Sequence, residues 1–168
     1  MTISMYAASV PVFRQMLASL SANLDKAEAH AADKKIDPNA LLQARLFPDM
    51  FALTRQVLIA ADFAKGACAR LAGVDVPKYD DTEQTFVELK ARLAKTLAFI
   101  DSLNPAQIDG SEAREITTSA GPNSKTFSGQ TYLLHYALPQ FFFHATTAYA
   151  LLRHNGVEVG KRDFMGKF

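Results

Sequence analysis

Four segments of the chain repeat apolar residues every three or four positions, and this spacing places each set on one face of an α-helix. The first set is Tyr6, Val10, Phe13, Leu17, Leu20, Leu24 and Ala27. The second is Met50, Thr54, Val57, Ala61, Ala64, Cys68 and Leu71, and the third is Phe86, Leu89, Leu93, Leu97 and Ile100. The fourth lies in LPQFFFHATTAYALLRHNG, residues 138–156. Four such faces can cover one another in a four-helix bundle, so we predict an all-α fold.

Capping and helix-breaking residues mark the ends of these segments. Gly73 follows the second set as a predicted C-cap, and Asn155-Gly156 closes the fourth in the same manner. Asp81, followed three residues later by Gln84, resembles a capping box that opens the third helix. Pro11 either kinks the start of the first helix or leaves the first turns outside it.

The composition changes in REITTSAGPNSKTFSG, residues 114–129, which is rich in β-branched and turn residues. Gly-Pro-Asn-Ser separates two short strand-like runs there, so we predict a small β-hairpin before the last helix. Ser128 is then placed to cap that helix. Because there is no internal repeat and no long linker, we predict that residues 1–168 form a single domain.

Charge and cysteine content exclude several classes of protein. There are 18 Lys and Arg residues against 17 acidic residues, so the net charge attracts neither nucleic acid nor an anionic membrane. The single cysteine, Cys68, cannot form an internal disulfide and has no neighbouring base, which favours a buried structural role. Residues 1–13 lack the pattern of a signal peptide, and no run of about 18 apolar residues occurs. We therefore expect a cytoplasmic protein with no nucleic-acid or membrane partner.

Two stretches of the sequence resemble the DinB/YfiT-like superfamily of bacterial four-helix bundles, and within it an uncharacterised bacterial domain family. They are LFPDMFALTRQVLIAADFAKGACARLAG, residues 46–73, and LPQFFFHATTAYALLRHNGVEVGKRDFMG, residues 138–166. The resemblance covers nearly the whole chain and implies a DinB-like bundle. Many members of the superfamily hold a divalent metal with one histidine on the second helix and an HxxxH pair on the last. Some of them act as thiol-dependent transferases or isomerases.

Only one of these three histidines has a counterpart in this chain. Matching LLRHNG to the end of the last helix places the HxxxH motif on Gln140 to His144. The position on the second helix falls at Gln56, or at Val57 if the register differs by one residue. The resemblance thus implies a degenerate metal site. If this site binds zinc or nickel, the ligands are His144, Gln140 and Gln56. We predict no metal and no cofactor, because neutral amides bind first-row metals weakly.

The spacing of four residues places Gln140 and His144 on one face of the last helix, among apolar neighbours that turn this face inward. In one interpretation the two side chains hydrogen-bond to each other as a buried structural pair. In the other they belong to a functional site. The predicted ligand-binding residues are then Gln56, Gln140, His144 and Tyr149.

The remaining histidines are weaker candidates for a site. His30 and His154 lie near helix ends, where a solvated side chain suits the helix dipole. His135 is nine residues before His144, so the two could share a metal only if Pro139 bends the helix.

Two further stretches predict contacts of the last helix and of the C-terminus. Phe141, Phe142 and Phe143 together cover most of the helix circumference, which favours a homodimer that covers the outer ring. The C-terminal VGKRDFMGKF, residues 159–168, mixes basic and apolar residues. Its basic residues either hold an anion at the mouth of a pocket, or stay in solvent while the apolar residues fold back onto the bundle.

Three functions are compatible with these features, and the sequence leaves open whether the protein is an enzyme. The first is a bundle that binds a small apolar or amphipathic molecule in a central cavity, where inward-facing alanines of the second helix leave room. The second is a metal-dependent thiol transferase or hydrolase of the DinB-like type. The third is a structural interaction module.

Overall fold

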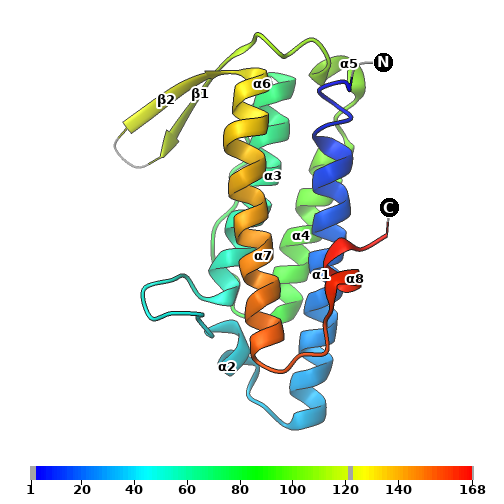
Figure 1. Cartoon of the computed structure of the whole chain (residues 1–168), viewed down its shortest axis with the longest axis vertical. Coiled ribbons are helices and arrows are strands. Elements are labelled where there is room, and N and C mark those ends of the chain that lie inside the picture. Colours follow the sequence, from blue (N-terminus) through cyan, green and yellow to red (C-terminus); the bar gives the residue numbers. More distant parts are fainter. Residues whose placement is uncertain (1–2, 121–122, 168) are drawn as a thin grey trace.

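The structure is a computed structural model, and it describes residues 3–120 and 123–167. Its four long helices are α1 (Val10–Lys34), α3 (Leu53–Ala72), α4 (Phe86–Asp101) and α7 (Leu138–His154). They lie side by side along the long axis of the molecule, with α3 packed against α7 and α4, and α1 packed against α4 (Figure 1). The predicted four-helix bundle is therefore confirmed.

Shorter elements connect and cover the bundle. They are α2 (Pro38–Leu42), α5 (Pro105–Ile108), β1 (Glu115–Ala120), β2 (Asn123–Ser128), α6 (Gly129–Thr131), the π-helical η1 (Tyr132–Ala137) and α8 (Lys161–Met165). β1 and β2 pair antiparallel, with Glu115 opposite Ser128, so the predicted hairpin is confirmed. The Gly-Pro pair of its expected turn, residues 121–122, lies outside the described residues.

The core is built from the predicted apolar faces. Phe13, Leu17 and Leu24 of α1 and Leu89 and Leu93 of α4 have no exposed surface. Five of the thirteen buried residues of α3 are alanines, and these small side chains let the neighbouring helices, α7 above all, lie close to α3. Within residues 3–120 and 123–167, no helix is both long and apolar enough to cross a membrane.

The start of α4 differs from the prediction. The capping box is formed by Thr85 and Glu88: the Thr85 hydroxyl accepts the Glu88 N–H at 3.2 Å, and the Glu88 carboxylate accepts the Thr85 N–H at 3.0 Å. The proposed box at Asp81 was wrong because Asp81 binds charged groups instead. Its carboxylate accepts a hydrogen bond from buried Arg92 at 2.8 Å and pairs with Arg55. Arg92 thus holds the loop before α4 onto the bundle.

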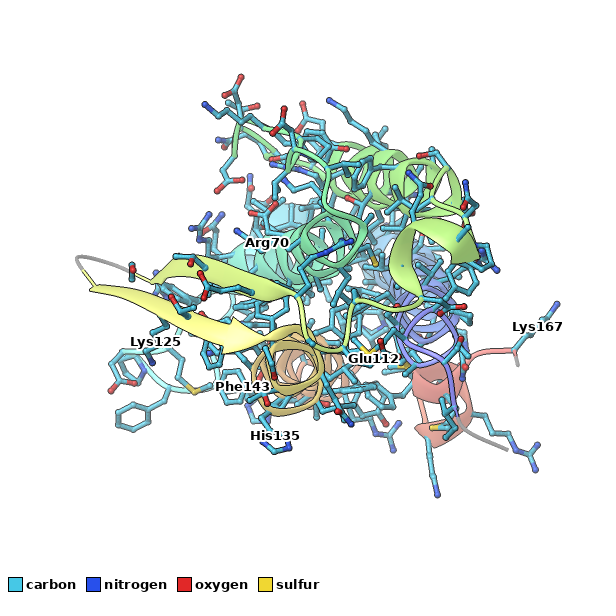
Figure 2. All side chains as sticks on the ribbon, turned by 90° about the horizontal axis from the view of Figure 1, so that it is seen from above. Arg70, Glu112, Lys125, His135, Phe143 and Lys167 are labelled. Atoms are coloured by element: carbon cyan, nitrogen blue, oxygen red, sulfur yellow. The ribbon has the colours of Figure 1, made fainter. Side chains whose placement is uncertain are left out.

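The last helix contains a widened segment. α6, η1 and α7 run as one continuous rod, yellow to orange in Figure 1. Ser128 caps its start as predicted, accepting the Thr131 N–H at 3.4 Å. Pro139 has no N–H to offer the carbonyl of His135, and the π-helical turns immediately precede it. Figure 2 shows the His135 side chain projecting outward, so the shared metal site with His144 is not formed.

The C-terminal segment folds back onto the bundle. The Ser19 hydroxyl of α1 donates a hydrogen bond to the Phe164 carbonyl at 2.7 Å, and the Phe164 ring packs edge-on against Tyr149 at 5.5 Å. Lys26 pairs with Asp163 at 2.7 Å. The basic residues Arg162 and Lys167 remain exposed, as expected if the apolar side chains supply the packing.

We predict that Gly129→Ala destabilises the protein by about 1 to 3 kcal/mol or more, since a Cβ there would lie 2.0 Å from the Ser111 carbonyl oxygen, which belongs to rigid backbone. Gly160→Ala is the matched control, because the nearest atom to its Cβ would be 3.9 Å away. Urea unfolding of both variants measures the difference. A Gly129→Ala variant as stable as the Gly160→Ala variant would show that the hairpin is not held this closely.

Candidate functional site

The candidate site is centred on a contact between α3 and α7. His144 of α7 places Nδ1 2.7 Å from Oε1 of Gln56, which lies in the first turn of α3. His144 is 8% exposed and Gln56 is 1% exposed, so the contact is largely removed from solvent. The pair is brought together by the close packing of the two helices, although 88 residues separate them in sequence.

The orientation of the Gln56 amide determines which histidine nitrogen carries the proton. Its Nε2 donates a hydrogen bond to the Phe51 carbonyl at 3.2 Å, which turns Oε1 toward His144. A carbonyl oxygen can only accept, so Nδ1 of His144 is the protonated nitrogen. Nε2 then carries the lone pair, and among the described residues it has no hydrogen-bond partner. We refer to this chain of bonds from Phe51 through Gln56 to His144 as the amide relay.

The surroundings keep the imidazole neutral. Burial lowers the pKa of His144, and the positive charge of Arg55 lowers it further. Arg55 lies on α3 beside Gln56 and is paired with Asp81. Because the ordinary pKa of histidine is about 6.5, a lowered value leaves Nε2 unprotonated near neutral pH.

Aromatic rings surround the imidazole. Phe63 of α3 stacks nearly parallel to it, with ring centroids 6.0 Å apart, and Phe143 meets it edge-on at 5.2 Å. Tyr136 of η1 contacts Phe63 at 6.0 Å and Phe127 of β2 at 5.2 Å. A row of rings therefore leads from the hairpin to His144.

We did not predict Phe63 or Tyr136 at this site, although the position of Phe63 on α3 could have indicated it. Phe63 lies seven residues after Gln56, two helical turns along the same face of α3. Tyr136 could not be placed in the same way, because the π-helical turns of η1 change the register of the last helix.

The predicted hydrogen bond between Gln140 and His144 was wrong. Among the described residues, His144 bonds to Gln56 across the helix interface, and half-buried Gln140 has no side-chain hydrogen bond. Gln140 still lies one turn before His144 on the same helix. The alternative register, which placed Val57 at the site, is also wrong. Gln56 contacts His144, and Val57 is buried in the apolar core.

Tyr149 is not brought to this site. Its ring packs against Phe164 of α8, on a side of α7 different from that of His144. The expected room beside the alanines of α3 is absent as well. Ala60, Ala61 and Ala64 have no exposed surface, which would not hold if they lined a cavity wide enough for water.

The polar residues of the site suit a divalent metal poorly. One imidazole nitrogen and two neutral amides do not supply the three or four strong ligands of a zinc centre. Gln56 in particular uses both ends of its amide in the relay. Over the described ranges, no group of three or more His, Cys, Asp or Glu residues could hold a metal ion.

We expect the stability of the protein to depend on His144 and on pH together. The folded-state pKa is lowered, so between about pH 6.5 and that lower value only the unfolded chain takes up the proton. The free energy of unfolding therefore falls as the pH falls through this window. Above about pH 6.5, the protonation of His144 no longer changes the free energy of unfolding. His144→Phe removes this dependence and costs about 1 to 3 kcal/mol at about pH 8, because Gln56 loses its partner.

Urea melts of the parent and the variant at about pH 8 and about pH 5.5 measure both effects. His135→Phe is the control on the same rod, because that histidine is exposed. A His144→Phe variant with unchanged stability and the same pH dependence as the parent would contradict a buried neutral imidazole.

Comparison with known proteins places this chain in a family. Residues 5–165 match the domain of unknown function DUF1993. The chain is also similar to a DinB family member protein from Shewanella denitrificans, known from a crystal structure. The two share 43% sequence identity with a TM-score of 0.88, over 97% of this chain and 92% of the other. A search of the curated proteins finds no match. The chain thus belongs to the DUF1993 family and has the DinB fold.

Proposed function

We propose that the protein binds a small amphipathic molecule on the face formed by α3 and α7, and that His144 accepts a hydrogen bond from it. The amide relay is the observation that carries this proposal. It uses Nδ1 within the protein and leaves the lone pair of Nε2 without a partner in the described chain. Nε2 is not among the fully buried polar atoms that lack a partner, so a ligand hydroxyl or N–H group can reach it and donate to its lone pair.

The aromatic neighbours favour a ring as the apolar part of the ligand. Phe63 and Phe143 already contact the imidazole, and Phe143 is 56% exposed. Stacked and edge-on aromatic contacts add about 0.5 to 1.5 kcal/mol beyond the area that they bury. The proposed ligand is thus a small aromatic molecule that carries a hydrogen-bond donor.

The shape of the bundle supports binding at this face. The β1–β2 hairpin and the segment that links α2 to α3 project from the same side of the bundle, one near each end (Figure 1). α3 and α7 lie between them on this side. The hairpin contributes Phe127 to the row of rings, and the linking segment contributes the Phe51 carbonyl of the relay. A ligand beside His144 would lie between these two projections.

A metal-dependent transferase or hydrolase of the DinB-like type is less consistent with this site. The tautomer fixed by the relay does present Nε2, the nitrogen that a metal would need. The remaining ligands would be Gln140 and Gln56, and Gln56 is engaged on both sides. We therefore place no metal-dependent step on these residues.

Phenol and anisole provide a direct test, because both have the same ring but only phenol can donate a hydrogen bond. We expect phenol at millimolar concentration to raise the melting temperature of the parent and anisole to have little effect. His144→Phe should abolish the response to phenol. Tyr149→Phe is the control on the same helix and should respond as the parent does, since Tyr149 packs against Phe164.

Equal stabilisation by the two compounds, or a response to phenol that survives in His144→Phe, would contradict the proposed site. Elemental analysis gives a further contradicting result. About one zinc or nickel per purified chain, lost in His144→Phe, would favour the metal-dependent alternative.

The exposed ring of Phe143 also favours the homodimer. Of the three consecutive phenylalanines, Phe141 is fully buried, Phe142 is half-buried and Phe143 is 56% exposed. Phe47 and Phe51, in the segment before α3, are 62% and 52% exposed. A second copy packed on Phe143 would remove an exposed aromatic ring from water and close the outer side of the ligand site.

Light scattering at micromolar concentration should give twice the chain mass for the parent, and Phe143→Ser should shift the protein to a monomer. Val87→Ser is the matched control, because Val87 is 62% exposed on α4. A parent that is monomeric, or a dimer that survives in Phe143→Ser and not in Val87→Ser, would contradict pairing through this face.

A further inference from the structure

A hollow of about 530 Å³ lies between α3 and the loop that links α3 to α4, residues 73–85. Residues 76–80 of the loop form one wall. The residues of α3 that form the other wall are Asp62, Lys65, Gly66 and Arg70. The volume falls in the range of small-molecule sites in proteins. None of the lining residues belongs to the site at His144, so the hollow is separate from the proposed function.

Lys65 places a buried positive charge in this wall. It is 5% exposed, and its Nζ pairs with the Asp62 carboxylate at 2.8 Å. That carboxylate is shared, because Nη1 of buried Arg92 lies 3.8 Å from the same oxygen. The Lys65 Nζ also lies 4.0 Å from the centre of the Tyr79 ring. A buried ammonium group is costly unless negative charge faces it, so a further anion in the hollow would be favourable.

Gly66 makes room for a second cation, the guanidinium group of Arg70. A Cβ at residue 66 would lie 2.5 Å from Nη1 of Arg70, so the guanidinium occupies the place of a side chain there. The Tyr132 hydroxyl accepts a hydrogen bond from the same Nη1 at 3.2 Å and holds the group in position. Glycine in the interior of a helix costs stability, and we attribute its presence here to the close approach of Arg70.

Arg70 has donors left for a ligand. A guanidinium group carries five N–H bonds, and the contact with Tyr132 uses one of them. Among the described residues Arg70 makes no ion pair, and its other nitrogens are not among the fully buried polar atoms that lack a partner. A molecule in the hollow can therefore reach them.

The charges around the hollow favour an anion. Lys78 and Asp80 both line it and are both exposed, so their opposite charges offset each other. Asp62 also faces the hollow, but it is compensated by two buried cations. The charge of Arg70 has no carboxylate partner in the described chain, and it leaves the hollow with an excess of positive charge.

We propose that this hollow binds the phosphate group of a small soluble molecule. The Arg70 guanidinium donates to its oxygens, Lys65 supplies a second positive charge, and Val76 and Pro77 offer an apolar surface to the organic part. Arginine binds phosphate oxygens through parallel N–H bonds. A phosphate group carries nearly two negative charges at about pH 7, so it suits two cations better than a carboxylate does.

NMR titrations of the ¹⁵N-labelled protein with inorganic phosphate and with ethyl phosphate test this site, with sodium chloride holding the ionic strength constant. We expect saturable shifts of the Arg70 side-chain N–H and of the backbone amides of residues 62–70 and 78–80, with a Kd of about 1 to 10 mM for phosphate. Ethyl phosphate should bind at least as tightly. Vesicles that contain phosphatidic acid should not sediment the protein, because the loop would hold a bilayer away from Lys65.

Gly66→Ala is the sharpest variant. The added Cβ displaces the Arg70 guanidinium, so phosphate binding should weaken by about tenfold, the effect of losing one charge-assisted contact. The melting temperature should stay the same or rise, because alanine favours a helix more than glycine does. Arg70→Gln should weaken phosphate binding to the same extent. Lys95→Gln is the matched control, because Lys95 is exposed and contacts the Tyr79 ring at 4.1 Å without lining the hollow.

Three results would overturn the phosphate site. They are shifts that do not saturate, full phosphate binding in Gly66→Ala or Arg70→Gln, and equal weakening in Lys95→Gln and Arg70→Gln. Weaker binding of ethyl phosphate than of phosphate, or binding to vesicles that is lost in Arg70→Gln, would contradict a small soluble molecule as the source of the phosphate group.

Discussion

The close packing of α3 against α7 determines where the polar groups of this bundle can lie. Five alanines of α3 have no exposed surface, and α7 is the helix that packs most extensively against α3. At this short distance Gln56 and His144 meet across the interface rather than reaching solvent. A larger residue at the alanine positions would separate the helices and break the relay that orients the imidazole.

The helices and the hairpin could be predicted from the sequence because each depends on local signals. An apolar face every three or four residues, a glycine C-cap and a run of β-branched residues all act within one element. The capping box at Thr85 shows the limit of such signals. Asp81 has equally suitable spacing, but its carboxylate is engaged by Arg92 of α4 and by Arg55 of α3. A competing long-range ion pair cannot be seen in a local pattern.

The candidate site depends more on contacts between elements. The resemblance placed Gln56 and His144 at one site and the structure brings them into contact, whereas spacing paired His144 with Gln140 because those two share one helix face. The rings of Phe63 and Tyr136 join the site through packing and through the π-helical turns of η1. The superfamily pattern implies three histidines, and this chain has one imidazole oriented by an amide. In this chain Gln56 is a hydrogen-bonding partner of the imidazole.

The tautomer of His144 is the most direct test of the amide relay and of the function proposed from it. The ¹⁵N chemical shifts of the imidazole nitrogens, measured at neutral pH on protein labelled in histidine, distinguish the two neutral tautomers from the imidazolium ion. We predict a neutral ring with the proton on Nδ1 and a lone pair on Nε2, and a loss of this preference in Gln56→Leu. A proton on Nε2, or a charged ring at neutral pH, would contradict it.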